Sequence, residues 1–235
     1  DALGRTTTLQ YDNGCLVRIT NPLGKQAHLT CNGAGQPNSV TDALGNTTTL
    51  HYYGYDLAAV TDPMGRSVQF RHDALGRVVA TEDAQGNLTR REYDAEGRVV
   101  KVYDALDRVT ELAYDPNGNV TAVLMPHGNG ITYEYDSRDR LVGRTDSLGQ
   151  TESWTYDTMN RATSYTDRKG QTTSFAYDAL GRQATTTYAD SSVVTATYDA
   201  GDRLLSLADT GTGTLGWIYD DLDQVIQALT PQGNI

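Results

Sequence analysis

The chain has 235 residues and a formal net charge of −11, and only 38% of its residues are hydrophobic. Such an acidic chain lacks the basic stripe needed to bind nucleic acid phosphates, so nucleic acid is not expected as a partner. No stretch reaches the roughly 18 apolar residues of a membrane-spanning helix. The chain is instead rich in Tyr (15 residues) and Gly (23 residues). These residues favour strands and turns, so the composition predicts an all-β protein.

A repeat begins at the first residues and continues to the last. Residues 1–5 look like a repeat already under way. Counting back from Tyr93, His72 and His51 occupy the same slot, and Cys31 and Tyr11 follow after one deletion. From residue 93 on, the slot holds a Tyr-Asp pair at every 21st residue: Tyr93-Asp94, Tyr114-Asp115, Tyr135-Asp136, Tyr156-Asp157, Tyr177-Asp178, Tyr198-Asp199 and Tyr219-Asp220. This spacing predicts a single array of about eleven repeats over residues 1–235, incomplete at both ends, with no separate catalytic or toxin domain.

Each repeat contains two turns of the form Asp-x-x-Gly followed by Arg, Asn or Gln, as in residues 94–98. Asp is favoured at the first position of a type I turn, where its carboxylate accepts a backbone N–H. The fourth position needs a left-handed backbone, as in a G1 bulge. Where Gly is replaced there, the substitute is Asn or Asp, which tolerate that backbone best, with Ser191 as the exception: Asp107, Asp139, Asn160, Asp202 and Asp223.

The six or seven residues between turns are rich in Val, Thr and Tyr, and at about 3.3 Å per residue each stretch spans roughly 20 Å as a strand. One repeat is therefore a β-hairpin plus the turn to the next. A lone hairpin is marginal in water, so the copies are expected to pair side by side. Few large apolar residues alternate along these strands. The pattern predicts a curved antiparallel ribbon with both faces largely wet, along which the Tyr slots form a ladder of stacked rings.

Several local patterns imitate functional motifs. Residues 211–216 (Gly-Thr-Gly-Thr-Leu-Gly) match a dinucleotide-binding fingerprint, but a strand rather than a helix follows, so a loosened turn is the favoured interpretation. His51 and His72 occupy the Tyr slot and are interpreted as aromatic residues that take the place of Tyr. His28 has no recognisable partner, and His127 lies in a turn.

The many aspartates are read as turn caps. Calcium binding at rows of stacked carboxylates is the alternative, although their spacing matches no calcium-binding loop. We therefore predict no catalytic residue, no cofactor-binding residue, no cofactor and no metal-ligating residue, and an enzyme is the least favoured class.

Cys15 and Cys31 are the two cysteines of the chain. Two cysteines cannot form a disulfide framework, and the sequence is compatible with one bridge or with two free thiols. Two unpaired thiols are the favoured expectation.

The paired 21-residue period, with copies such as Tyr177-Asp178-Ala179-Leu180-Gly181-Arg182, resembles the YD repeats of the Rhs family. Similar repeats occur in the B and C components of Tc toxins and in the teneurin YD shell. The resemblance implies a β-sheet ribbon that spirals into a hollow shell, which in bacterial members encloses a C-terminal toxin. Asp62-Pro63 and Asp115-Pro116 look superficially like the family's self-cleavage segment, but both fall on the register of the repeat's own turns, where Pro is favoured.

The resemblance therefore predicts a scaffold segment of an Rhs-type shell. Its partners would be the neighbouring repeats and the enclosed toxin, with carbohydrate as a further candidate. It would be secreted or exposed at the cell surface through a bacterial secretion system. The alternative is a surface-exposed repeat protein that binds carbohydrate or another cell. Unpaired sheet edges also predict self-association of the excised ribbon.

Overall fold

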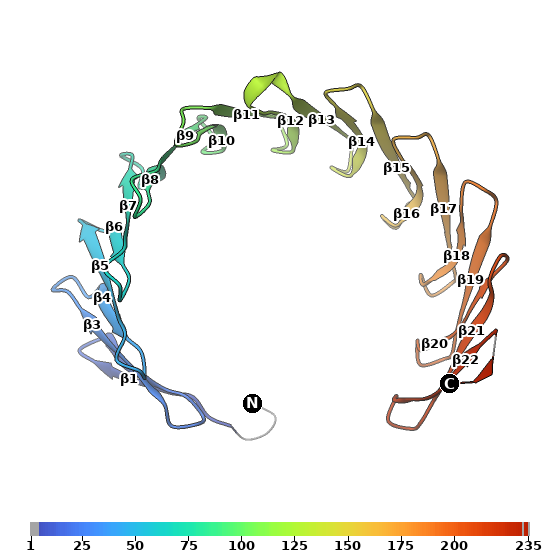
Figure 1. Cartoon of the computed structure of the whole chain (residues 1–235), viewed down its shortest axis with the longest axis horizontal. Coiled ribbons are helices and arrows are strands. Elements are labelled where there is room, and N and C mark those ends of the chain that lie inside the picture. The colour runs from blue at the N-terminus through green and yellow to red at the C-terminus, as the bar shows by residue number, and fades with distance from the viewer. Residues whose placement is uncertain (1–4, 232, 235) are drawn as a thin grey trace. The chain divides into compact units, whose positions relative to one another are not determined.

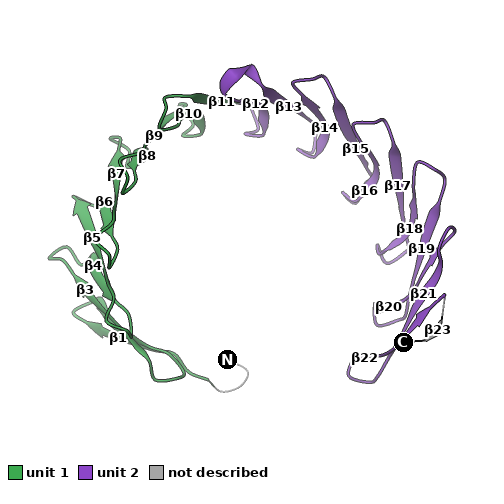
Figure 2. Ribbon diagram, in the orientation of Figure 1, with its two compact units in different colours: residues 1–112 green, residues 113–235 purple. Residues whose placement is uncertain are grey.

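The computed structural model describes residues 5–231, 233 and 234 and divides into two compact units at residues 112 and 113, shown in different colours in Figure 2. Each unit is described by itself. The expectations about an incomplete first repeat at residues 1–4 and about the chain end at residues 232 and 235 fall outside the described residues.

Unit 1 is a succession of antiparallel hairpins whose strands pair in chain order (Figure 1). Its strands are β1 (Thr8–Asp12), β2 (Cys15–Thr20), β3 (Gln26–Cys31), β4 (Pro37–Thr41), β5 (Thr47–Tyr53), β6 (Asp56–Thr61), β7 (Ser67–His72), β8 (Val78–Glu82), β9 (Leu88–Tyr93) and β10 (Val99–Tyr103). Strand β11 (Val109–Tyr114) contains the division between the units.

Unit 2 repeats the same arrangement. Its strands are β12 (Val120–Leu124), β13 (Gly130–Tyr135), β14 (Leu141–Asp146), β15 (Thr151–Tyr156), β16 (Ala162–Thr166), β17 (Thr172–Tyr177), β18 (Gln183–Thr187), β19 (Val193–Tyr198), β20 (Leu204–Asp209), β21 (Gly213–Tyr219), β22 (Val225–Thr230) and β23 (Gly233–Asn234). The 3₁₀ turn η1 (Pro126–Gly128) is the one helical element of the described chain. No described helix is both long and apolar enough to cross a membrane. The all-β prediction is confirmed.

The turn at residues 157–161 shows why the sequence pattern recurs. Asp157 Oδ1 accepts the backbone N–H of Met159 at 2.8 Å and that of Arg161 at 2.9 Å. The N–H of Asn160 bonds to the carbonyl of Asp157, and the N–H of Asp157 bonds to the carbonyl of Arg161. These bonds belong to a type I turn closed by a G1 bulge, as predicted, and they satisfy the groups that the strands leave unpaired.

The fourth turn position has a positive φ whichever residue occupies it. Gly97 has φ 83°, and Asp and Asn replacements adopt the same backbone: Asp107 (59°), Asp139 (59°), Asn160 (66°), Asp202 (66°) and Asp223 (63°). Ser191, which departs from the expected residue types, also has φ 68°. The prediction is therefore confirmed, and the constraint extends even to the exceptional copy.

The two edges of the hairpins differ. Next to each Tyr-Asp turn the strand register shifts by one residue, as between Thr155 and Tyr156, where Tyr156 pairs with Ala162. At the other edge the register continues without a shift, as where Thr166 pairs with Thr172 and Ser164 with Ser174. Because a bulge bends and twists its strand, the extra residue gives each repeat the same local distortion on one side.

A thick core is absent from the described residues. Ala80 (6% exposed) is the one buried hydrophobic side chain among them, and no large side chain is fully buried. Along β15 and β17, side chains alternate between exposed and half-buried. Leu44, at a turn tip, is 83% exposed. The expectation of a largely wet ribbon is confirmed, so contacts other than core packing must hold the strands together.

The Gly97 turn provides a direct test of the left-handed position. Val at residue 97 should lower the melting temperature clearly, because a β-branched residue resists a positive φ, whereas Asn should be mild. A Cβ at this position would meet nothing closer than Arg77 Nη1 at 3.8 Å, so steric crowding does not confuse the comparison. Circular dichroism melting of both variants gives the measurement. Equal melting temperatures for Gly97→Val and Gly97→Asn would contradict the turn geometry.

Candidate functional site

The arginine after each Tyr-Asp turn bonds in two directions. Arg140 Nε donates to its own turn carboxylate, Asp136 Oδ2, at 2.7 Å. Its Nη1 donates to the carbonyl of Asp157 in the next repeat at 2.9 Å, and its guanidinium lies 4.8 Å from the ring centroid of Tyr156. One side chain is thus fixed to its own turn by an ion pair and joined to the next repeat by a hydrogen bond and a cation–π contact. We call this arrangement the arginine–tyrosine interlock.

The cation–π contact of the interlock recurs with constant spacing, and the bond to the next repeat's carbonyl accompanies it at Arg77, Arg140, Arg182 and Arg203. The arginine always precedes its tyrosine by 16 residues, with guanidinium-to-centroid distances between 4.4 and 5.1 Å: Arg77 and Tyr93, Arg140 and Tyr156, Arg161 and Tyr177, Arg182 and Tyr198, Arg203 and Tyr219. The tyrosine hydroxyl in turn donates to the carbonyl 15 residues earlier, as from Tyr177 to Ala162 at 2.7 Å and from Tyr156 to Leu141 at 2.8 Å. Each Tyr therefore anchors itself on the preceding hairpin.

The expected ladder of directly stacked rings is wrong. Slot tyrosines of successive copies lie two strands apart, which is roughly 10 Å and too far for rings to touch. In each interlock a guanidinium, rather than a second ring, lies over the tyrosine. Among the described residues the structure records one aromatic pair, Trp154 with Tyr165, whose centroids lie 5.3 Å apart and which involves no slot tyrosine. The 16-residue spacing between Arg and Tyr was visible in the sequence and would have revealed the interlock.

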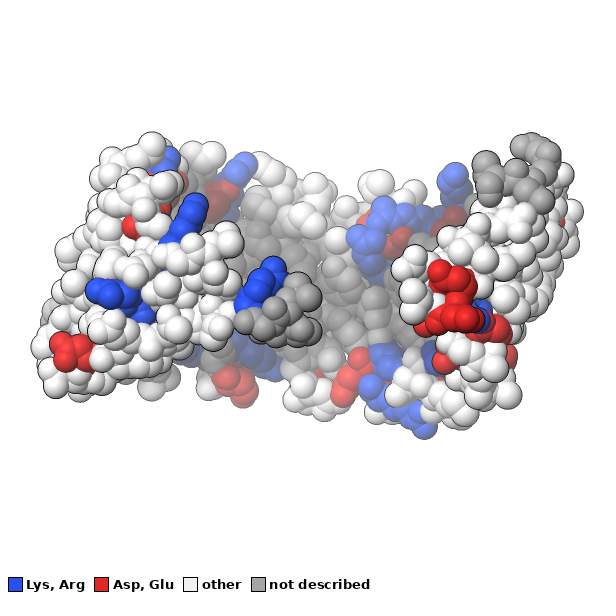
Figure 3. Space-filling model, turned by 90° about the horizontal axis from the view of Figure 1, so that it is seen from below, with Lys and Arg blue, Asp and Glu red and all other residues white. Residues whose placement is uncertain are grey.

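Charge pairing around the turns lowers carboxylate pKa values. The hydrogen bond from the Arg140 side chain lowers the pKa of Asp136 to about 2, and the backbone N–H groups of Arg138 and Arg140 act in the same direction. For Asp157 the backbone N–H of Arg161 is the largest cause of a lowered pKa, followed among the lowering effects by the Arg161 side chain. Figure 3 shows the resulting mixture, in which acidic and basic side chains lie beside one another.

A second polar cluster lies on β14, β15 and β16. Glu152 Oε2 accepts Arg144 Nη1 at 2.6 Å, and Glu152 Oε1 accepts the Tyr165 hydroxyl at 2.9 Å. The bond from Tyr165, and then that from Arg144, lowers the pKa of Glu152. Because its charge is matched and its oxygens are occupied, this carboxylate is arranged to link strands rather than to transfer protons.

Three of the histidines singled out in the sequence lie in strands or turns of the repeats. His72 occupies the Tyr slot at a register shift, opposite Val78. The assignment of His51 to that slot is wrong, because Tyr52 takes it, opposite Leu57. The tight hairpin at Gly54 is one residue shorter than the usual turn, which moves the slot by one position. His127 lies in η1 with φ 73°.

Residues 211–216 lie in a turn and in β21, with no helix following, so they lack the context of a dinucleotide site. Asp62 and Asp115 cap turns of the usual geometry before Pro, accepting the N–H of Met64 and of Asn117. No group of three or more His, Cys, Asp or Glu within the described part of the chain is placed to hold a metal ion. The predictions of no catalytic, cofactor-binding or metal-ligating residue remain predictions.

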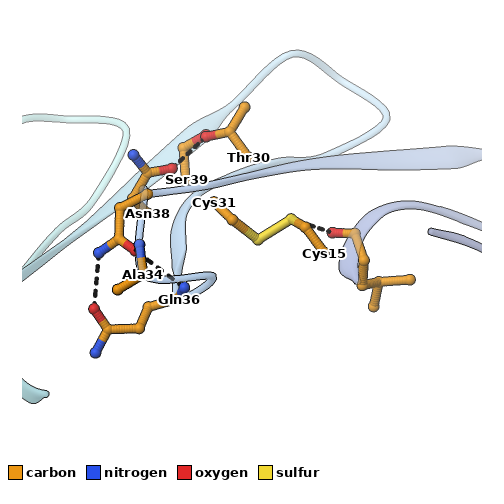
Figure 4. Close-up of a disulfide and its surroundings, with 9 residues drawn as sticks. Cys15, Thr30, Cys31, Ala34, Gln36, Asn38 and Ser39 are labelled. Carbon is orange, nitrogen blue, oxygen red and sulfur yellow. Dashed lines mark hydrogen bonds between the residues drawn. A yellow bond between two sulfur atoms is a disulfide. The ribbon is translucent and has the colours of Figure 1, made fainter. Parts of the chain in front are cut away.

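The expectation of two free thiols is wrong. Cys15 and Cys31 form a disulfide, with Cα atoms 6.2 Å apart, as Figure 4 shows. The residues face one another at the ends of the neighbouring antiparallel strands β2 and β3, which the sequence spacing alone did not reveal.

The Teneurin YD-shell family profile matches residues 66–227, which is more than half of the chain. The chain belongs to the teneurin YD-shell family. The matched residues contain the unit described above, with the Tyr-Asp pair at the slot and first turn position and, in most copies, the interlocking Arg after the turn. Its membership supports a structural, shell-type role for the repeats.

Solved structures share the fold of this YD-shell segment. The crystal structure of TcdB2-TccC3-Cdc42 aligns with 15% identity and a TM-score of 0.56 over 95% of this chain. The structure of the Photorhabdus luminescens Tc holotoxin pore aligns with 15% identity and a TM-score of 0.57 over 96% of this chain. In both cases this chain spans 15% of the length of the matched chain. Curated protein sequences contain no match.

The interlock predicts measurable coupling between its members. In a double-mutant cycle on Arg161→Met and Tyr177→Leu, measured by urea denaturation, we expect a coupling free energy of about 0.5–1 kcal/mol, the range of an exposed cation–π contact. Arg161 with Tyr219, two copies further on, is the matched control pair and should give a coupling near zero. Equal coupling for both pairs would contradict the interlock.

The depressed pKa of Asp136 predicts a pH-dependent contribution to stability. The ordinary Asp value is 3.8 and the folded value is about 2, so the stabilisation is complete above about pH 5 and is lost as the pH falls toward 2. Asp136→Asn keeps an acceptor for the turn, as Asn21 does in its own turn, but loses the charge. Its deficit in melting temperature should be present at pH 7 and vanish near pH 2. A deficit that stays constant over this range would count against the charge pairing.

Proposed function

We propose that this chain is a wall segment of an Rhs-type shell, whose full-length protein encloses a C-terminal toxin polypeptide before delivery to a target cell. The recurring arginine–tyrosine interlock carries this proposal, because it joins successive repeats in a ribbon whose described residues form no thick core. Membership of the YD-shell family and the fold shared with Tc toxin structures support it. The proposed array is continuous through both units.

Such a wall would separate the enclosed polypeptide from its surroundings rather than catalyse a reaction. Backbone groups are paired along the hairpins, and hydroxyls on exposed strand positions bond to one another, as between Thr197 and Ser206 at 2.6 Å. Turn carboxylates such as Asp199 are committed to Arg and to backbone N–H groups. A surface whose polar groups are already satisfied offers little affinity to an enclosed polypeptide. We therefore propose a non-enzymatic role without cofactor.

The proposed partners are the neighbouring YD repeats and the enclosed toxin, and nucleic acid is not among them because the net charge is −11. The proposed location of the full-length protein is outside the producing cell or on its surface, reached by a bacterial secretion system. Self-association of the excised segment through unpaired strand edges, including that of β1, remains a prediction.

Two exposed tyrosines favour a second candidate function. Tyr53 and Tyr55 flank Gly54 at a hairpin tip and are 87% and 88% exposed. Exposed aromatic rings are common at recognition surfaces, since they present a large rigid area at low entropic cost. A carbohydrate-binding or cell-adhesion repeat protein is accordingly the alternative.

The deciding experiment uses the parent protein extended through its native C-terminus. Denaturing gels and native mass measurement show whether a tail has been severed and stays associated, and limited proteolysis shows whether it is protected. We expect a severed, protected tail. Replacing Arg161 by Met and Tyr177 by Leu together should make the tail more protease-sensitive. Met159→Ala, at a turn tip that is 71% exposed, is the matched control and should leave protection unchanged.

A tail that is uncleaved, or freely digested in the unaltered protein, would overturn the shell proposal. Binding of the intact protein to a glycan array, lost in a Tyr53→Ala and Tyr55→Ala variant, would then support the adhesion alternative.

A further inference from the structure

The disulfide lies at the position of an interlock. Cys15 follows Gly14, whose φ is 83°, and begins β2, as Arg77 follows Gly76 (φ 75°) just before β8. Cys31 ends β3 at a register shift and pairs with Pro37, as Tyr177 ends β17 at a register shift and pairs with Gln183. The two cysteines are separated by 16 residues, the same separation as Arg and Tyr in every interlock. Cysteine therefore occupies both positions of one such pair.

The neighbouring repeats explain why a covalent link matters at this place. The next two slots along unit 1 hold Tyr52 and His72, and the residues 16 positions before them are Gln36 and Asp56 rather than Arg. Gln36 reaches across only through its amide, which donates to the carbonyls of Gly54 and Tyr55 at 3.4 and 3.3 Å. The first guanidinium–tyrosine contact recorded in unit 1 is that of Arg77 with Tyr93. The hairpins before it therefore lack the guanidinium that joins repeats elsewhere.

We infer that Cys15 and Cys31 form a redox-dependent covalent version of the arginine–tyrosine interlock, which locks the β2–β3 hairpin only under oxidising conditions. Closing the lock converts two thiols to one disulfide and releases two protons and two electrons, which a small-molecule disulfide accepts as it becomes two thiols. A dithiol reductant reverses the step and is itself oxidised to a cyclic disulfide. The remaining interlocks contain no cysteine, so oxidation and reduction leave them unchanged.

This inference does not rest on the proposed shell function. In a reducing compartment the hairpin would be held by its strand pairing alone. In an oxidising one it would gain the constraint of a closed loop between residues 15 and 31, which limits its local opening. The stability of the β2–β3 hairpin would thus depend on whether the compartment is oxidising or reducing. The Arg-linked repeats would be equally stable in both kinds of compartment.

Hydrogen exchange read by mass spectrometry on the whole chain tests the inference, with and without dithiothreitol. Amides of β2 and β3 should exchange on the order of a hundredfold faster after reduction, the effect expected from opening a loop of this length. Amides of β16 and β17, held by Arg161 and Tyr177, are the internal reference and should not change. Thiol titration under denaturing conditions should find no free thiol before reduction and two after it.

Two double variants separate the covalent lock from a merely structural role. Cys15→Ser with Cys31→Ser should exchange like the reduced chain and ignore dithiothreitol. Cys15→Arg with Cys31→Tyr installs the usual pair and should regain protection that is independent of the reductant. The inference would be overturned by two free thiols in the unreduced chain, by β2–β3 exchange that reduction leaves unchanged, or by an Arg/Tyr variant no better protected than the Ser/Ser one.

Discussion

The contact of one guanidinium with the tyrosine ring and the carbonyl of the next repeat is the interaction on which this chain depends. A ribbon in which Ala80 is the one buried hydrophobic side chain of the described residues cannot rely on core packing. Strand pairing alone would leave the hairpins free to twist against one another. Arg140 removes that freedom, because it is fixed at Asp136 by an ion pair and held over Tyr156 at the same time. The same side chain therefore rigidifies its own turn and attaches the next.

The stability of the ribbon comes from small contributions that recur in successive repeats. A cation–π contact, a turn cap and a tyrosine hydrogen bond each contribute about 1 kcal/mol or less at a partly exposed site. None of them would hold a hairpin alone. Each contribution recurs in successive copies, and in repeat proteins the total behaves as a sum over units and their interfaces. Such an array tolerates the loss of one interlock, as at Gln36, provided that its neighbours remain or another linkage replaces it.

The sequence predicted the hairpins, the turn type and the wet faces, because all three follow from local chemistry that one chain displays. The positive φ of Asp107 and Asn160 could be foreseen, since the pattern of Gly replacements reveals the backbone directly. Two predictions failed where distance in space mattered. The rings were expected to stack, although a two-strand spacing separates them, and His51 was aligned by counting 21 residues across a hairpin that is one residue short. The Cys15–Cys31 bridge was missed for the same reason. The two cysteines face one another across neighbouring strands because they are 16 residues apart, and that relation between positions was not recognised in the sequence.

The constant spacing has an evolutionary consequence. A repeat with the usual residues offers an arginine forward and a tyrosine backward, so a duplicated or deleted block of 21 residues between such repeats leaves their donors and acceptors matched. Recombination at any boundary between such blocks would yield a chain whose junction is bonded like the rest. Shorter insertions or deletions within the 16 residues between an arginine and its tyrosine would break the match, whereas the short hairpins at Gly14 and Gly54 lie outside that span. Such an array could therefore gain or lose whole repeats, while the side chains that span the 16-residue spacing keep that spacing constant.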